Sequence, residues 1–106
     1  MGSLLDLPQR PSAVFIGSDL VALGAVNIIH QRGLHIPHDI SVIGFDDLMF
    51  SQYLQPPLTT IHLPPYDLGR RAGETLLSIM NGEPSSIRRL LLPTEIRVRG
   101  TTAPLT

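Results

Sequence analysis

Residues 39–47 read DISVIGFDD, an apolar run that ends in two acidic residues. A short β-branched run without polar alternation predicts a strand that is buried on both faces, as in a parallel sheet. Residues 13–16 (AVFI) have the same character, and the segment between the two runs reads as a helix. Strand, helix and strand within about 30 residues predict a right-handed βαβ unit. The predicted fold class is therefore α/β, a parallel sheet with flanking helices.

The helix of this unit is predicted over residues 20–32, where apolar side chains recur at helical spacing. Ser18 or Asp19 can cap its first turn, because a short side-chain oxygen accepts an unpaired amide hydrogen there. Arg32 suits the negative end of the helix dipole. Gly33 suits the left-handed residue that ends a helix. Capping residues at both ends thus support one amphipathic helix over residues 20–32.

The rest of the chain predicts a second, similar series of elements. Residues 58–62 read as a strand, and residues 64–81 as a helix that begins with proline and stops at Gly82. Residues 87–92 and 95–99 are two further strand candidates. The second helix is expected to bury an apolar stripe made of Leu68, Ala72, Leu76, Ile79 and Met80. We expect residues 1–12 to be a short lead-in and residues 101–106 to be a loose end.

Composition excludes several classes of protein. With 106 residues, 42% hydrophobic and 16% charged, the chain suits one small ordered domain. There is no cysteine, which excludes disulfides and thiolate chemistry. The eight basic residues are all arginine and the net charge is −1, so we do not expect the chain alone to bind nucleic acid. No apolar run predicts a membrane span, and the start lacks a signal peptide, which is compatible with a cytoplasmic protein.

Two polar pairs follow the predicted strands, Ser18 with Asp19 and Asp46 with Asp47. Ligands of open α/β sheets bind beyond the carboxyl ends of the strands, where both pairs fall. Successive side chains of an extended segment point in opposite directions, so at most one aspartate should face a cleft. Strand-end capping is the alternative for both residues. A paired-aspartate metal site lacks an obvious third ligand, and the four histidines do not form a ligand set, so we expect no metal, no cofactor and no catalytic residue.

Several short phrases, in this order, resemble one family. They are AVFIGSD (13–19), ALGA (22–25), GL and IP (33–37), DISVIGFDD (39–47), PPLTTI (56–61), LGRRA (68–72) and LPTEIRVR with TT (92–102). Together they resemble the carboxy-terminal part of the effector domain of LacI/GalR-type transcriptional regulators, which has a periplasmic-binding-protein-like fold. The resemblance covers residues 8–104. A full member of the family carries a DNA-binding headpiece that is absent from this chain.

The resemblance implies a division of the chain. Residues 1–12 are the lead-in, and residues 13–60 are part of the carboxy-terminal effector subdomain. Residues 61–93 are the hinge crossing and a helix of the amino-terminal subdomain, and residues 94–106 are the return strand and tail. The chain would then be a fragment with an incomplete sheet. We therefore expect a dimer or a partner-dependent fold, low stability as a monomer and weak effector binding by the chain alone.

The resemblance also assigns site residues. It implies that Asp46 accepts hydrogen bonds from sugar or ribose hydroxyls, with Phe45 as the aromatic residue before it. Ser18 stands where many members have asparagine, and Leu63 where many have glutamine, which puts the polar contacts to the effector in doubt. The implied hinge residues are Ile61, His62, Leu63, Leu92 and Pro93. The implied dimer interface is Leu23, Val26, Asn27, Phe50, Tyr53 and Leu54, for which burial within one subunit is the alternative.

The function implied is effector sensing for transcription: a small polar metabolite, most simply a sugar, binds between two lobes of a homodimeric cytoplasmic regulator. DNA is contacted only through the headpiece, and no membrane and no enzymatic step is involved. A sugar-binding transport protein of the same superfamily is one alternative. A small magnesium-dependent α/β enzyme that uses Asp46 and Asp47 is another. A fragment with no activity of its own is the third.

Overall fold

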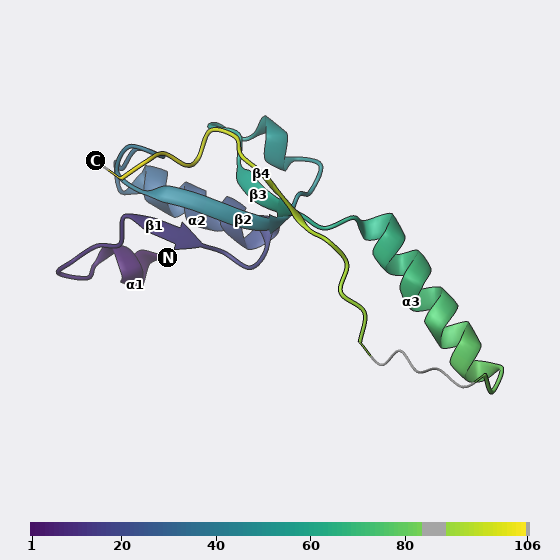
Figure 1. The fold of residues 1–106 in the computed structure, drawn as a ribbon. Coiled ribbons are helices and arrows are strands. Elements are labelled where there is room, and N and C mark those ends of the chain that lie inside the picture. Colours follow the sequence, from purple (N-terminus) through teal and green to yellow (C-terminus); the bar gives the residue numbers. More distant parts are fainter. Residues whose placement is uncertain (84–88, 106) are drawn as a thin grey trace. The chain divides into compact units, whose positions relative to one another are not determined.

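The computed structural model describes residues 1–83 and 89–105 of the chain. The elements, labelled in Figure 1, are α1 (Gly2–Leu5), β1 (Ala13–Phe15), α2 (Asp19–Gln31), β2 (Ser41–Asp46), the 3₁₀ turn η1 (Ser51–Tyr53), β3 (Thr59–His62), α3 (Pro65–Met80) and β4 (Glu95–Arg97). They fall into two compact units. Unit 1 comprises Met1–His62 with Ile96–Thr106, and unit 2 comprises Leu63–Glu95.

The four strands form one sheet in the order β1-β2-β3-β4. β1 and β2 run parallel, with Ala13 opposite Ser41, and β2 and β3 run parallel, with Ile43 opposite Thr59. The prediction of a parallel βαβ unit is therefore confirmed. Parallel pairing brings the carboxyl ends of these three strands to one edge of the sheet. This edge is called the carboxyl rim below.

The ends of α2 follow the predicted signals. The Ser18 hydroxyl oxygen accepts a hydrogen bond from the Leu20 amide at 3.2 Å, which caps the first turn. Arg32 ends the helix and Gly33 follows with φ 73°, a left-handed conformation that glycine adopts at low cost. Gly82 has the same φ of 73° after α3. Local capping chemistry thus sets the helix limits.

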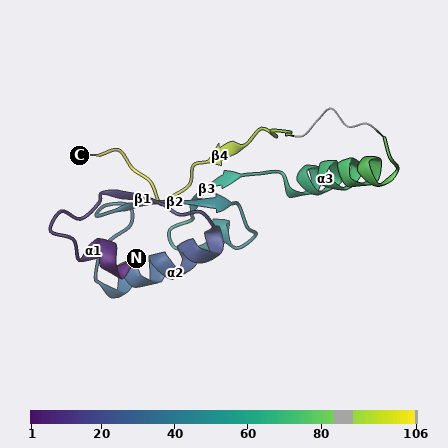
Figure 2. The ribbon, with the colours of Figure 1, turned by 90° about the horizontal axis from the view of Figure 1, so that it is seen from below.

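The core of unit 1 lies between α2 and the sheet. Figure 2 shows α1 and α2 on the same side of the strands. The buried side chains of this core are Ala22, Val26, Ile29, Ile36, Ile40, Val42 and Leu58. The lead-in also contributes, because it contains the short helix α1, whose last residue Leu5 and N-cap Met1 pack against the core. An ion pair between Asp6 and Arg32, 2.5 Å long, ties this segment to the end of α2.

The expectation of a loose carboxyl-terminal tail is wrong. Thr101 is fully buried, and its hydroxyl donates to the Val42 carbonyl at 2.6 Å while accepting from the Thr59 amide at 2.9 Å. The Thr101 carbonyl accepts from the Val42 amide at 2.8 Å. Ala103 follows with a bond from its amide to the Ser41 hydroxyl. The tail is ordered because it satisfies backbone groups of β2 and β3 that would otherwise be buried without partners.

The second helix has the predicted limits but not the predicted burial. No residue of α3 is buried, and Leu68, Leu76 and Ile79 are 44%, 58% and 57% exposed. An amphipathic stripe is buried only when another surface covers it. Among the described residues of unit 2, only a shallow hollow forms there, with Leu90 and Leu92 beside the stripe. The expectation of a buried stripe is therefore wrong for this chain.

The prediction of a strand over residues 87–92 is also wrong for the part of this range that the structure describes. Residues 89–92 are not in a strand, and residues 87 and 88 lie outside the described residues. The strand expected at 95–99 is present as β4, although it is shorter. None of the helices in the described part of the chain is long and apolar enough to cross a membrane.

Thr101 gives a direct test of the anchored tail. Changing Thr101→Val keeps the shape but leaves the Thr59 amide and the Val42 carbonyl short of a buried partner, which costs about 1–3 kcal/mol per group. We expect the free energy of unfolding in urea to fall by roughly 2–4 kcal/mol. The control Thr94→Val changes an exposed threonine and should stay within about 0.5 kcal/mol of the parent. A Thr101→Val chain as stable as the control would contradict the anchoring role.

Candidate functional site

Polar side chains gather at the carboxyl rim of unit 1. Ser18 and Asp19 follow β1, Asp46 and Asp47 lie at the end of β2, and His62 ends β3. The parallel register places Asp46 opposite His62. The structure therefore brings together the two polar pairs that the sequence singled out, and it adds His62, which the sequence indicated only as a hinge residue.

Asp19 is the buried support of this rim. Its side chain is fully buried at the first residue of α2. One carboxylate oxygen accepts from the Thr60 hydroxyl at 2.6 Å. The other accepts from the Ser51 hydroxyl at 2.5 Å and from the Leu48 amide at 3.0 Å. These bonds tie α2, β3 and the segment after β2 together, so Asp19 holds structure and is not available to a ligand.

Asp47 is the centre of an ion cluster. Its Oδ1 accepts from Arg99 Nη2 at 2.7 Å, and its Oδ2 lies 2.9 Å from His62 Nδ1. Arg97 Nε approaches the same Oδ2 at 4.0 Å. Arg99 was not singled out from the sequence. It lies 52 positions after Asp47 in the chain. No local spacing signals such a contact.

The charge state of Asp47 reflects opposing effects. Burial acts to raise the pKa of the Asp47 carboxyl, because a low-dielectric surrounding disfavours the charged form. The hydrogen bond and positive charge of Arg99, followed by those of His62, outweigh burial and hold this pKa below its usual value. The ion cluster thus keeps Asp47 ionised.

The backbone at the end of β2 is unusual. Asp46 has φ 109° and Asp47 has φ 57°, both on the positive side that residues with a side chain rarely occupy. Each such residue costs roughly 1–3 kcal/mol, and the cost is borne only where surrounding contacts enforce the conformation. The simple alternation of side chains expected for a straight strand therefore does not apply past Phe45.

Asp46 differs from its two acidic neighbours. Its side chain is half-buried, and among the described residues no side-chain hydrogen bond or ion pair engages its carboxylate. A carboxylate offers several lone pairs to hydroxyl donors. Phe45 is half-buried beside it in β2. Asp46 is thus the rim acid whose carboxylate has no side-chain partner among the described residues.

Ser18 combines two properties. Its hydroxyl oxygen is used as the cap of α2, which is the capping role that the sequence allowed. A hydroxyl that accepts one bond still has a hydrogen to donate. Ser18 therefore retains one donor at the rim, and nothing in the described structure assigns that donor a partner.

The residues expected at a dimer interface lie in different surroundings. Leu23 and Tyr53 are 40% and 74% exposed, and Asn27 is also exposed. Val26 is 6% exposed and belongs to the core of unit 1, which is the within-subunit burial that was its alternative. Leu54 also packs against this core, and Phe50 is half-buried.

The expected hinge residues lie around the limits of the two units. Ile61 and His62 are the last residues of the first stretch of unit 1, and Leu63 is the first residue of unit 2. Leu92 and Pro93 lie in unit 2, shortly before β4. Whether motion occurs there remains a prediction.

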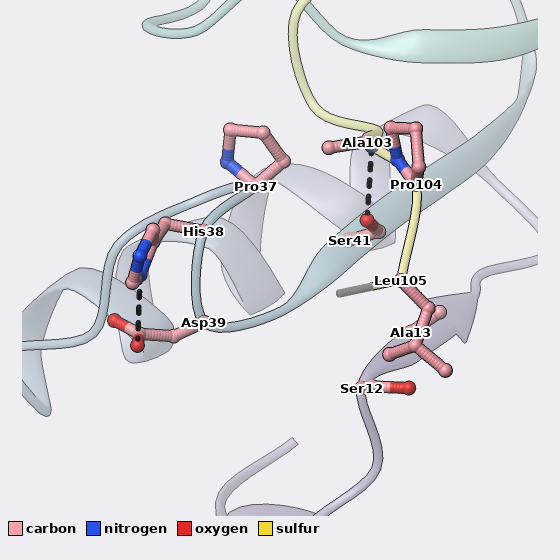
Figure 3. A pocket seen from close by; sticks show the side chains of 9 residues that line it. All are labelled: Ser12, Ala13, Pro37, His38, Asp39, Ser41, Ala103, Pro104 and Leu105. Atoms are coloured by element: carbon pink, nitrogen blue, oxygen red, sulfur yellow. Dashed lines mark hydrogen bonds and ion pairs between the residues drawn. The ribbon is translucent and has the colours of Figure 1, made fainter.

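A second hollow, of about 170 Å³, lies at the opposite edge of the sheet, where β1 and β2 begin (Figure 3). It is lined by Ser12, Ala13, Pro37, His38, Asp39, Ser41, Ala103, Pro104 and Leu105. Two of its polar side chains are already engaged, since the Ser41 hydroxyl accepts from the Ala103 amide and Asp39 binds the His35 amide and His38. No group of three histidine or acidic side chains in the described residues is arranged to hold a metal ion.

Comparison with known proteins gives one family. Residues 2–102 match the family described as the periplasmic binding protein-like domain. The chain is 46% identical over 105 residues to the transcriptional repressor CytR of Escherichia coli, covering 99% of this chain and 31% of CytR. It is 47% identical over 90 residues to the ribose operon repressor of Haemophilus influenzae, covering 85% of this chain and 27% of that repressor. The chain spans about a third of the length of these curated relatives.

Solved structures agree. A LacI-family transcriptional regulator from Enterococcus faecium with bound ribose superposes with a TM-score of 0.84 and 32% identity, over 99% of this chain and 38% of that one. The lac repressor dimer bound to operator and an anti-inducer superposes with a TM-score of 0.78 and 38% identity, over 87% of this chain and 32% of the repressor. These likenesses extend through both units of the chain.

The Asp47 cluster predicts how acid affects stability. Because the folded-state pKa of Asp47 lies below its unfolded value of about 3.9, its stabilising contribution is present above that pH and is lost as the pH falls through the folded value. We expect the stability difference between the parent and Asp47→Asn to shrink as urea unfolding is repeated from pH 6 down to pH 3. A difference that stays constant over this range would show that the charge of Asp47 contributes nothing.

Proposed function

Because the chain belongs to the periplasmic binding protein-like domain family, and within it to the effector domain of LacI-type regulators, we propose that it supplies the carboxy-terminal half of a metabolite-binding cleft. The ligand is a small polyhydroxylated molecule, a sugar or a nucleoside. Asp46 accepts hydrogen bonds from its hydroxyls, Ser18 donates one, and Phe45 lies next to Asp46 in the strand. Members of this family are not enzymes, and the proposal involves no chemical step.

The observation that carries this proposal is that two of the three aspartates at the carboxyl rim have side chains bonded within the chain, whereas Asp46 has no such bond among the described residues. Both oxygens of Asp19 and of Asp47 accept bonds from within the chain. The Asp46 carboxylate has no such partner among the described residues, and it lies at the carboxyl end of a parallel strand, where open α/β sheets bind ligands. The ribose in the Enterococcus faecium structure supports a sugar as the ligand class.

Regulation follows from binding between two lobes. A ligand that binds one arrangement of the lobes more tightly shifts the population toward that arrangement. The size of the shift is limited by the difference between its affinities for the two arrangements. We place the two subdomains at the two units of this chain, with Ile61, His62 and Leu63 on one crossing and Leu92 and Pro93 on the other. DNA contact would come from the headpiece of a full member of the family, in the cytoplasm. The alternatives of a transport protein and of a magnesium enzyme have no supporting observation, because the similar proteins reported above are transcriptional regulators.

The ligand test uses a chimera, because this chain supplies only part of a cleft. The chain replaces the matching segment of the ribose operon repressor, and binding of ribose, sucrose and uridine is measured by calorimetry. We expect Asp46→Asn to weaken the best ligand at least about tenfold, since a hydrogen bond to a charged group contributes about 1.5–3 kcal/mol. Asp67→Asn, on the exposed surface of α3, is the matched control and should bind as the parent does. Equal affinity for Asp46→Asn and the control, or no binding of any probe, would contradict the proposal.

We also propose that the exposed side of α2 is part of a homodimer interface, as in the lac repressor dimer. The proposed surface consists of Leu20, Val21, Leu23 and Asn27 of α2, with Tyr53 of the 3₁₀ turn η1; all but Asn27 are large hydrophobic residues that are 40–74% exposed. Of the expected interface residues, Val26 is left out because it lies in the core of unit 1, Leu54 because it packs against that core, and Phe50 because it is half-buried. Exposed apolar patches of this kind are typical of association surfaces.

Light scattering after size-exclusion chromatography tests the interface. We expect the chain to be a dimer, and Leu23→Glu to shift it toward monomer, because a charge buried in an apolar interface has no partner. Thr94→Glu, at an exposed polar position outside any apolar patch, is the control and should leave the mass unchanged. A dimer that survives Leu23→Glu would place the interface elsewhere.

A further inference from the structure

Two consecutive residues with side chains adopt positive φ at the end of β2. Asp47, with φ 57°, lies in the left-handed region that aspartate tolerates, whereas Asp46, with φ 109°, lies outside it. Such conformations persist only when surrounding contacts enforce them. Because the two residues are adjacent, the contacts that fix the backbone of Asp47 also affect the position of the Asp46 carboxylate.

The contacts that hold Asp47 come from two segments, β3 and the residues after β4. Its amide donates to the Thr60 hydroxyl of β3 at 3.4 Å. Its carboxylate binds Arg99 at 2.7 Å through one oxygen and His62 at 2.9 Å through the other. The Asp47 side chain is only 14% exposed. Both oxygens thus have a partner from inside unit 1, so the Asp47 carboxylate is already engaged in holding structure.

Arg99 extends this cluster to the start of β3. Its Nη1 donates to the Leu58 carbonyl at 3.0 Å, and its backbone amide donates to the Thr59 hydroxyl at 2.9 Å. The Arg99 side chain is 20% exposed, and its fork geometry allows it to bind a carbonyl and a carboxylate at once. The Asp47 carboxylate is therefore attached to a guanidinium that is itself fixed to the sheet.

We propose that Asp47 is the positioning residue of the effector site: held by Arg99 and His62, its carboxylate fixes the positive-φ backbone at residues 46 and 47 and thereby orients Asp46. This inference rests on the proposed function. The two adjacent aspartates have different tasks, since the first contacts the ligand and the second holds the first in place. Asp47 does not contact the ligand itself.

Amide hydrogen exchange of the ¹⁵N-labelled chain tests the positioning role directly, through the amides of residues 47 and 48. Asp47→Asn keeps the size and removes the charge, whereas Asp47→Gly removes the side chain but adopts positive φ without strain. We expect both variants to exchange at least tenfold faster than the parent at these amides. If Asp47→Gly exchanges within twofold of the parent, the residue serves only the backbone conformation and the proposal is wrong.

Asp6→Asn is the matched control, because it removes an exposed aspartate–arginine pair at the other end of α2. It should leave exchange at residues 47 and 48 unchanged, and an equal rise there would mean that any lost ion pair loosens the turn. His62→Gln removes one partner of the Asp47 carboxylate. This variant replaces Asp47→Asn in the test if Asp47→Asn does not fold. It should raise exchange at least threefold, and no rise would overturn the proposal.

Ligand affinity separates this proposal from the proposed function. In the chimera described above, Asp47→Asn should weaken the best sugar or nucleoside about tenfold while Asp6→Asn leaves it unchanged. If the parent chimera binds no probe, the proposed function fails, and the exchange data still decide whether the carboxylate holds the turn. If exchange rises in Asp47→Asn but affinity does not change, Asp47 holds the turn without orienting Asp46, and the positioning role is wrong.

Discussion

The carboxyl rim depends on one buried carboxylate, that of Asp19. It accepts three hydrogen bonds, from Thr60, Ser51 and the Leu48 amide, and these come from β3 and from the segment that follows β2. Gly44 makes room for it, because a Cβ at that position would overlap the Asp19 carboxylate and press against Leu58. A buried carboxyl group is tolerated in the interior only when hydrogen bonds replace its lost hydration. The bond from the Leu48 amide to Asp19 thus holds the residue that follows the two positive-φ aspartates.

The sequence predicted the features that depend on neighbouring residues. The continuous apolar runs gave the parallel β1 and β2, because strands buried on both faces lack polar alternation. Ser18 and Gly33 gave the limits of α2, since capping depends on hydrogen bonds and dihedral angles within one turn. The position of Asp46 at the strand end followed from the same reasoning, although the left-handed backbone there has no signature in the residues DD.

Features that depend on distant partners were not predictable. Thr101 reads as part of a polar tail, and only its contacts with Val42 and Thr59 reveal that it is a buried bridge between strands. The partnership of Arg99 with Asp47 is hidden for the same reason. The stripe of α3 shows the converse, because helical periodicity predicts which residues share a face but not whether a surface covers that face.

The central claim is that Asp46 is the acid of the rim that contacts the ligand, while its neighbours hold the rim together. The most direct test is a crystal structure of the chimera with the probe that binds most tightly in calorimetry. We predict a ligand hydroxyl within about 3 Å of an Asp46 carboxylate oxygen, with Asp47 still bound to Arg99. A ligand held elsewhere, or one held by Asp47 after release of Arg99, would contradict it.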